Sequence, residues 1–296
     1  MTIDDFLTYL KIEKKTAANT REAYYRDIMA FDSFLKKRGV DDCKKASDTD
    51  VAAYMLELKN DGKSKATANR KLSSIRAYFK FLVKEEIISA NPAENIRAPK
   101  IERKELEYLT IEEVEKLLAT PDSSIKGLRD RAMLEMLYAT GIRVSEIIEL
   151  RLKDVNLRIG YVTCNGEHGR ARIVPMGTMA IKAAEEYIAG SRTALMRNGD
   201  PDDPDGPFFV NYTGAGFSRQ GFWKVLKQYG REAGLEERLT PHILRTTFAV
   251  HMVQNGADLK SLQELMGNED IMATQIYLSV TKSRIKDVYD RTHPRA

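Results

Sequence analysis

Two segments of the sequence combine an arginine with a second polar side chain at the start of an expected helix. In the first, Arg143 follows the turn residue Gly141, and Glu146 lies three residues later on the same helix face. A guanidinium beside the outward-pointing N–H groups of a helix N-terminus favours a bound phosphate, and Glu146 is placed to orient it. Taken alone, this segment also fits an ordinary surface ion pair.

The second segment contains a histidine and an arginine. Thr240 is suited to cap a helix, and Pro241 suits its first position. His242 and Arg245 then lie in the opening turn, three residues apart, so both donors point together from a positive helix end. A capping histidine beside an exposed arginine is the alternative interpretation.

A tyrosine supplies a third chemical group. Tyr277 ends a short expected helix near residues 270–278. A phenol with a pKa of ~10 is mostly protonated at neutral pH, so it becomes a nucleophile only beside a base or a strong positive field. A tyrosine in this setting is more often a core residue with a wet hydroxyl, so its role depends on the other groups.

The first hundred residues predict helices only, because apolar residues recur at steps of three and four. We place four helices in this region, near residues 2–12, 17–37, 48–60 and 67–86. The last has an apolar stripe suited to a core, formed by Leu72, Ile75, Tyr78 and Phe79. Its basic residues fall largely off that stripe. We therefore expect a polyanion to contact Lys63, Lys65, Arg70, Lys71 and Arg76.

A charged, proline-containing stretch separates this region from the rest of the chain. The sequence predicts a helical domain over 1–97, a linker over 98–108 and a second domain over 109–296. The second domain opens at Thr110 with a capping box. A hairpin is expected from Tyr161–Cys164 and Arg170–Val174, with Phe208–Val210 as a third strand. The remainder predicts helices near 128–139, 177–196, 218–233, 241–255, 258–266, 270–278 and 282–291.

Composition excludes several classes of protein. No apolar run approaches the ~20 residues that a membrane span needs, and the acidic N-terminus does not resemble a signal peptide, so we expect a cytoplasmic protein. Cys43 and Cys164 lie far apart and lack metal-ligand spacing. This pattern indicates free thiols and argues against a zinc site.

Taken together, these residues resemble the tyrosine recombinase (phage integrase) family, most closely its Xer branch. The Arg-x-Ser-Glu pattern matches Arg143 to Glu146, His-x-x-Arg matches His242 and Arg245, and Thr-x-x-Tyr matches Thr274 to Tyr277. The resemblance covers essentially the whole chain. It implies a mainly α, two-domain fold: an N-terminal helical, SAM-like core-binding module and a mostly helical catalytic domain with a small antiparallel sheet. It also makes Arg143, His242, Arg245 and Tyr277 the expected catalytic residues.

Two positions depart from the family pattern. Relatives carry a lysine in the hairpin loop that is expected to protonate the leaving 5′-oxygen, and Glu167 stands there in this chain, with His168 and Arg170 as substitutes nearby. Relatives usually show Leu-Gly-His where this chain has Met266, Gly267 and Asn268. Asparagine donates hydrogen bonds but cannot titrate near pH 7. These changes predict slower chemistry, or none.

The resemblance implies a function and a set of partners. The chain would cleave and rejoin duplex DNA through a 3′-phosphotyrosyl intermediate, without metal or cofactor, and resolve chromosome or plasmid dimers. Four identical or mixed recombinase subunits would assemble on DNA, with segment 282–296 packed on a neighbour and a cell-division protein as regulator. Three alternatives stay open: a DNA-binding paralogue with weakened or lost catalysis, a type IB topoisomerase, and a helix-turn-helix regulator unrelated to cleavage.

Overall fold

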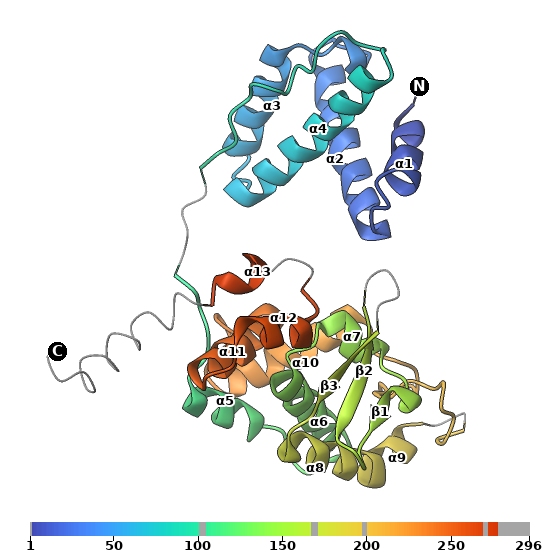
Figure 1. The fold of residues 1–296 in the computed structure, drawn as a ribbon, viewed down its shortest axis with the longest axis vertical. Helices are drawn as coiled ribbons and strands as arrows, with labels where there is room; N and C mark the ends of the chain where they lie inside the picture. The colour runs from blue at the N-terminus through green and yellow to red at the C-terminus, as the bar shows by residue number, and fades with distance from the viewer. Residues whose placement is uncertain (1, 101–104, 167–170, 197–199, 269–271, 278–296) are drawn as a thin grey trace, which may run out of the picture. The chain divides into compact units, whose positions relative to one another are not determined.

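The computed structural model describes residues 2–100, 105–166, 171–196, 200–268 and 272–277. The chain divides into two compact units, Met1–Lys104 and Glu105–Ala296. Both units consist mainly of helices, coloured from blue to red along the chain in Figure 1. Among the described residues, no helix is long and apolar enough to cross a membrane.

The first unit is a helical bundle around an aromatic core. Its helices are α1 (Ile3–Ile12), α2 (Ala18–Lys37), α3 (Asp48–Asn60) and α4 (Lys65–Lys84), with a short 3₁₀ turn at Cys43–Lys45. Capping boxes at Thr2 and Ser47 fix the starts of α1 and α3, since each side chain satisfies a backbone N–H of the first turn. The four helices predicted from apolar spacing are confirmed, with ends shifted by at most two residues.

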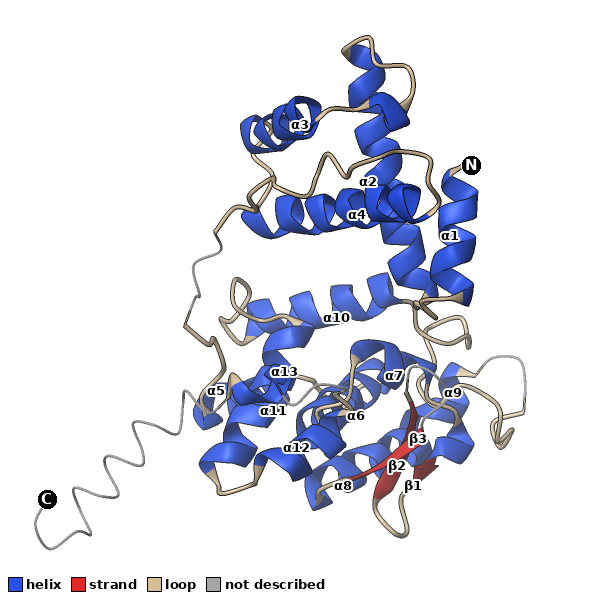
Figure 2. Cartoon of the chain, turned by 45° about the horizontal axis from the view of Figure 1, so that its top comes forward, coloured by secondary structure: helices blue, strands red, loops and turns tan. Residues whose placement is uncertain are grey.

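The second unit is built around one buried helix, α6 (Ile125–Thr140). Its residues Ala132–Leu137 are buried on every side, as expected for a helix enclosed by others. Figures 1 and 2 show α5 and α11 on one side of α6 and the strands on the other. The other helical elements are α5 (Ile111–Leu118), α7 (Val144–Glu149), η2 (Leu152–Asp154), α8 (Thr178–Tyr187), η4 (Ile188–Arg192), α9 (Thr193–Leu195), α10 (Arg219–Glu232), α11 (Pro241–Gln254), α12 (Leu259–Met266) and α13 (Met272–Gln275).

Most helix predictions for this unit are confirmed, and three need comment. The capping box at Thr110 is present. The helix expected near 177–196 changes to a π-helical turn at η4 after Tyr187. Among the described residues, the helix that leads to Tyr277 covers Met272–Gln275, and the helix expected near 282–291 lies outside them.

A three-stranded antiparallel sheet in the order β1-β2-β3 flanks the helices. The strands are β1 (Val155–Asn156), β2 (Tyr161–Asn165) and β3 (Ala171–Pro175). The predicted hairpin is therefore confirmed, and Cys164 pairs with Arg172 across it.

The prediction of a third strand at Phe208–Val210 is wrong, because β1 takes that place in the sheet. The side chain of Tyr187 bonds the backbone of this segment instead. Its hydroxyl donates to the Phe208 carbonyl at 3.0 Å and accepts from the Val210 N–H at 3.1 Å. Phe208 and Phe209 are fully buried. The segment is apolar because it fills the core, which produces the same sequence pattern as a strand.

Candidate active site

A tight turn brings the first candidate arginine to the start of a helix. Helix α6 ends at Gly141, which adopts the left-handed conformation with φ of +58°, and an added Cβ there would overlap the Phe248 ring. The chain can then re-enter a helix at once, with Arg143 at the N-cap of α7. The sequence prediction for this turn is confirmed.

Arg143 is held from two sides. Its Nη2 donates to the Gly267 carbonyl at 2.9 Å, and its Nη1 donates to Oε1 of Glu146 at 3.3 Å. The backbone N–H of Arg143 also donates to Oε2 of Glu146 at 2.6 Å. The Arg143 side chain remains 38% exposed, so the guanidinium is fixed and still open to a ligand.

Arg245 lies on α11, and its guanidinium bonds to the same two turns, at Gly141 and at the end of α12, that surround Arg143. Its Nη1 donates to the Gly141 carbonyl at 2.5 Å, and its Nη2 donates to the Met266 carbonyl at 2.6 Å and to Oδ1 of Asn268 at 3.0 Å. Burial, together with the positive charge of Arg143, lowers the pKa of Arg245 to about 10. It stays charged at neutral pH, and an anion in contact with it would offset the cost of burying that charge.

These residues line one cleft of about 550 Å³, the arginine pocket, whose wall includes Arg143, His242, Arg245, Asn268, Arg219 and Trp223. His242 is exposed in the first turn of α11, which Thr240 caps and Pro241 begins as predicted. Four basic side chains and an amide thus line one cavity, at the N-terminal ends of α7, α10 and α11. This arrangement suits a phosphate group.

Tyr277 is close to this pocket but buried. It is 5% exposed and packs in a cluster with Phe248, Leu262 and Met266. Burial raises the pKa of Tyr277, while a hydrogen bond with the Thr246 side chain and the charge of Arg245 partly offset that effect. Among the described residues, Tyr277 is not part of the pocket lining. The Tyr277 side chain is therefore buried in this apolar cluster and does not open into the arginine pocket.

Asn268 connects the arginine pocket with α13, the helix that precedes Tyr277. Its Oδ1 accepts from Arg245, and its Nδ2 lies 3.3 Å from Oγ1 of Thr274, a fully buried residue of α13. The amide is thus engaged on both sides. Glu167, His168 and Arg170, the hairpin-loop residues expected to affect proton transfer, lie outside the described residues.

Arg219 and Trp223 of the pocket wall were not selected from the sequence, and neither was Arg172, which contacts Glu146 beside the pocket. Arg172 on β3 donates from Nη1 and Nη2 to the two carboxylate oxygens of Glu146, at 2.6 and 2.9 Å. Burial would raise the pKa of Glu146, but the hydrogen bonds and charges of Arg172 and Arg143 outweigh it and hold the pKa below its usual value. The only sequence signal for Arg172 was its place just before the apolar end of an expected strand.

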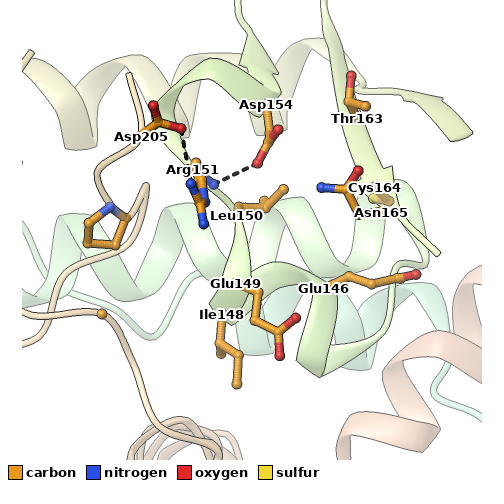
Figure 3. Close-up of a pocket in the computed structure, with 12 residues that line it drawn as sticks. Glu146, Ile148, Glu149, Leu150, Arg151, Asp154, Thr163, Cys164, Asn165 and Asp205 are labelled. Atoms are coloured by element: carbon orange, nitrogen blue, oxygen red, sulfur yellow. Dashed lines mark hydrogen bonds and ion pairs between the residues drawn. The ribbon is translucent and has the colours of Figure 1, made fainter. Parts of the chain in front are cut away.

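A second cleft, of about 590 Å³, lies on the other side of Glu146. Figure 3 shows Arg151 bonded to Asp154 and Asp205, with Glu146 and Glu149 across the opening. Four carboxylates line this cleft against one arginine. Its negative charge disfavours a phosphate, so the arginine pocket is the candidate active site.

The basic residues of the first unit fall into two groups. Lys63 and Lys65 are exposed at the start of α4. Arg70 and Lys71 both pair with the buried Asp27, and Lys71 is only 14% exposed. Arg76 donates to the carbonyls of Ala93 and Ile96, at 3.1 and 2.7 Å. Lys63, Lys65 and Arg70 are thus exposed, while Lys71 and Arg76 are partly buried.

The chain was compared with known proteins. Residues 107–284 match the phage integrase family, and residues 3–86 match the phage integrase N-terminal SAM-like domain. The chain belongs to the phage integrase family. Its curated relatives place it in the Xer branch, and it is a site-specific tyrosine recombinase.

Two relatives show the extent of this similarity. The chain is 42% identical over 295 residues to the tyrosine recombinase XerD of Oceanobacillus iheyensis, covering 99% of this chain and 98% of the relative. It is also 42% identical over 296 residues to the tyrosine recombinase XerD of Listeria innocua, covering 99% of each.

Solved structures share the fold. The Tn1549 transposon integrase in complex with transposon right end DNA aligns with a TM-score of 0.76 at 18% identity, over 97% of this chain and 99% of that one. The XerH site-specific recombinase bound to palindromic difH substrate aligns with a TM-score of 0.74 at 20% identity, over 97% and 82%. The predicted mainly helical fold, with its SAM-like module and small sheet, is confirmed.

Proposed function

We propose that this recombinase cleaves duplex DNA with Tyr277 and that Arg143, Arg245 and His242 bind the scissile phosphate. The observation that carries the proposal is the arginine pocket. Arg143 and Arg245 come from helices α7 and α11, yet both line one cleft, and both are bonded to the same turn after α12.

The reaction is a transesterification. The Tyr277 hydroxyl loses its proton and attacks phosphorus, a P–O bond forms to the tyrosine, and the bond to the 5′-oxygen of the next nucleotide breaks as that oxygen gains a proton. The product is a 3′-phosphotyrosyl linkage and a free 5′-hydroxyl, and the reverse reaction rejoins a strand. One diester replaces another, so no energy source is consumed. Removing one donor to the transition-state phosphate typically costs about 10²–10³ in rate.

Tyr277 must leave its packed position for this reaction, because its hydroxyl is covered. Moving from a buried to a wet site would also remove the burial that raises its pKa. We infer that DNA binding and tyrosine release are coupled through the turn that holds Arg245 and Asn268.

A recombinase that cleaves DNA needs DNA and further recombinase subunits as its partners. We propose that the first unit, residues 1–97 of the sequence, grips the duplex together with the catalytic unit, residues 109–296, and that residues 98–108 link them. Relatives solved with DNA include XerH and the Tn1549 integrase. We extend this to a tetramer of identical or mixed recombinase subunits on DNA that resolves chromosome or plasmid dimers under a cell-division regulator. A recombinase of such DNA would act in the cytoplasm, where the DNA is.

Covalent trapping tests the proposal. Duplexes that bind Tyr277→Phe protein are first selected from a random library, then nicked beside each candidate cleavage position so that a short fragment diffuses away after cleavage. We expect a denaturant-stable protein–DNA adduct with the wild-type protein and none with Tyr277→Phe. Tight binding with no adduct at any nick position would overturn the cleavage assignment.

That outcome would favour the second candidate function, a DNA-binding paralogue with weakened catalysis. Glu167 in place of the expected lysine motivates it, and so does Asn268. In the structure Oδ1 of Asn268 accepts from Arg245, while Nδ2 lies 3.3 Å from Oγ1 of Thr274 and 4.0 Å from Sδ of Met266, so the amide N–H groups are directed to protein atoms in this conformation.

A further inference from the structure

The C-terminal end of α12 and its cap residue Gly267 bind three arginines through three successive carbonyl groups. The Leu265 carbonyl accepts from Nε of Arg172 at 2.8 Å, the Met266 carbonyl accepts from Arg245, and the Gly267 carbonyl accepts from Arg143. The last carbonyls of a helix have no partner inside the helix and lie at its negative end. Cations are therefore well placed there.

Arg172 differs from the other two arginines. Its side chain is 13% exposed, and among the described residues it is not part of the wall of the arginine pocket. Its Nε and both Nη atoms bond to protein oxygens, namely the Leu265 carbonyl and the Glu146 carboxylate. The Arg172 guanidinium packs closely against Gly267, since a Cβ added at Gly267 would lie 2.8 Å from Nη1 of Arg172. Arg172 therefore acts on other protein groups and does not reach a ligand in the pocket.

The target of Arg172 is the carboxylate that also contacts Arg143. Glu146 has a side-chain exposure of 7%, so its charge needs partners. Arg172 supplies a two-point bond, while Arg143 contributes one longer bond of 3.3 Å from its side chain. Without Arg172, the Glu146 carboxylate loses the two-point bond that fixes its position, so the bonds that it makes to Arg143 no longer hold that guanidinium toward the pocket.

We propose that Arg172 is a positioning residue for strand cleavage: it binds Glu146 and the end of α12, and so keeps Arg143 directed into the arginine pocket. The proposal rests on the proposed function of that pocket. It adds a residue from the hairpin strand β3 to the groups on which the reaction depends.

The first test compares Arg172→Met and Arg172→Lys with Arg158→Met, which removes an exposed arginine from the turn between β1 and β2. Single-turnover cleavage is measured at saturating DNA, and affinity is measured separately. Misplacing a reacting group by about 1 Å costs on the order of 10²-fold. We expect about that loss of rate for Arg172→Met, a smaller loss for Arg172→Lys, and DNA affinity near wild type. A rate for Arg172→Met equal to that of Arg158→Met would overturn the proposal.

A second variant separates positioning from stability. Adding Glu146→Gln to Arg172→Met removes the buried charge that has lost its two-point partner, so the midpoint of thermal unfolding is expected to recover. Cleavage should stay low, because neither neutral side chain orients Arg143. If the cleavage rate recovers together with stability, Arg172 serves only the fold and the proposal fails.

A third readout does not depend on cleavage. The Nε–H resonance of Arg143 in ¹⁵N-arginine-labelled protein can be assigned from its loss in Arg143→Lys. We expect this resonance to shift or broaden in Arg172→Met and to stay in place in Arg158→Met. An unchanged resonance contradicts the inference even if the wild-type protein forms no adduct, whereas a missing adduct alone contradicts only the proposed function.

Discussion

Arg245 and Asn268 are joined by a hydrogen bond of 3.0 Å, and through it the candidate phosphate-binding arginine is connected to the segment that carries Tyr277. The same amide reaches Thr274, three residues before the tyrosine. A ligand that draws Arg245 toward the pocket would therefore weaken the contact that holds the tyrosine segment in place.

Replacing Asn268 with aspartate should slow cleavage. The added carboxylate would form an ion pair with Arg245 and repel an incoming phosphate, and it would lose the donor to Thr274. We expect a fall of about 10²-fold in single-turnover cleavage, comparable to the loss of one transition-state donor. Asn268→His, which restores the usual residue of relatives, should cleave faster than wild type. An aspartate variant as fast as the histidine variant would disprove this account of Asn268.

Arg143→Ala should lose cleavage while keeping DNA binding. The guanidinium contributes to one phosphate among many backbone contacts, so affinity changes little, but the transition state loses a donor. We expect a rate reduced by about 10²–10³-fold on the suicide substrate. Unchanged cleavage by the purified variant would refute the role assigned to Arg143.

The pH dependence of stability should reveal Glu146. Its pKa is lowered in the folded state, so it stabilises the protein above the pKa of an unfolded glutamate, about 4.3, and this contribution is lost as the pH falls through the folded value. The midpoint of thermal unfolding of wild type should exceed that of Glu146→Gln at pH 7. The difference between the two unfolding midpoints should shrink toward pH 3. Other carboxylates titrate in both proteins, so a gap that stays constant with pH would count against the lowered pKa.

The basic residues of the first unit should differ in their effect on DNA affinity. Each lost phosphate contact reduces the slope of log K against log salt by about 0.9. We expect Lys63→Ala and Lys65→Ala to reduce this slope without loss of stability, because both residues are exposed. Arg76→Ala should instead lower the midpoint of unfolding, since it breaks two bonds to backbone carbonyls. A salt slope unaffected by either lysine change would remove the start of α4 from the proposed DNA interface.

Local signals in the sequence determined the helices, the capping boxes and the hairpin. Thr110, Gly141 and Thr240 act on their immediate neighbours, so the chain itself fixed where these helices start and stop. The motif residues Arg143, His242 and Arg245 could be selected for the same reason, since each lies at a helix start that the sequence specifies.

Only the tertiary structure decided how these side chains are used. Arg172 became part of the site because β3 packs beside α12 and faces Glu146, a contact between residues 26 apart in sequence. Tyr277 proved to be buried, and Arg76 proved to bond its own unit, because burial and bonding depend on which distant segments pack against a residue. The segment Phe208–Val210 was misassigned for the same reason, since an apolar run shows that a segment is buried but not what it pairs with.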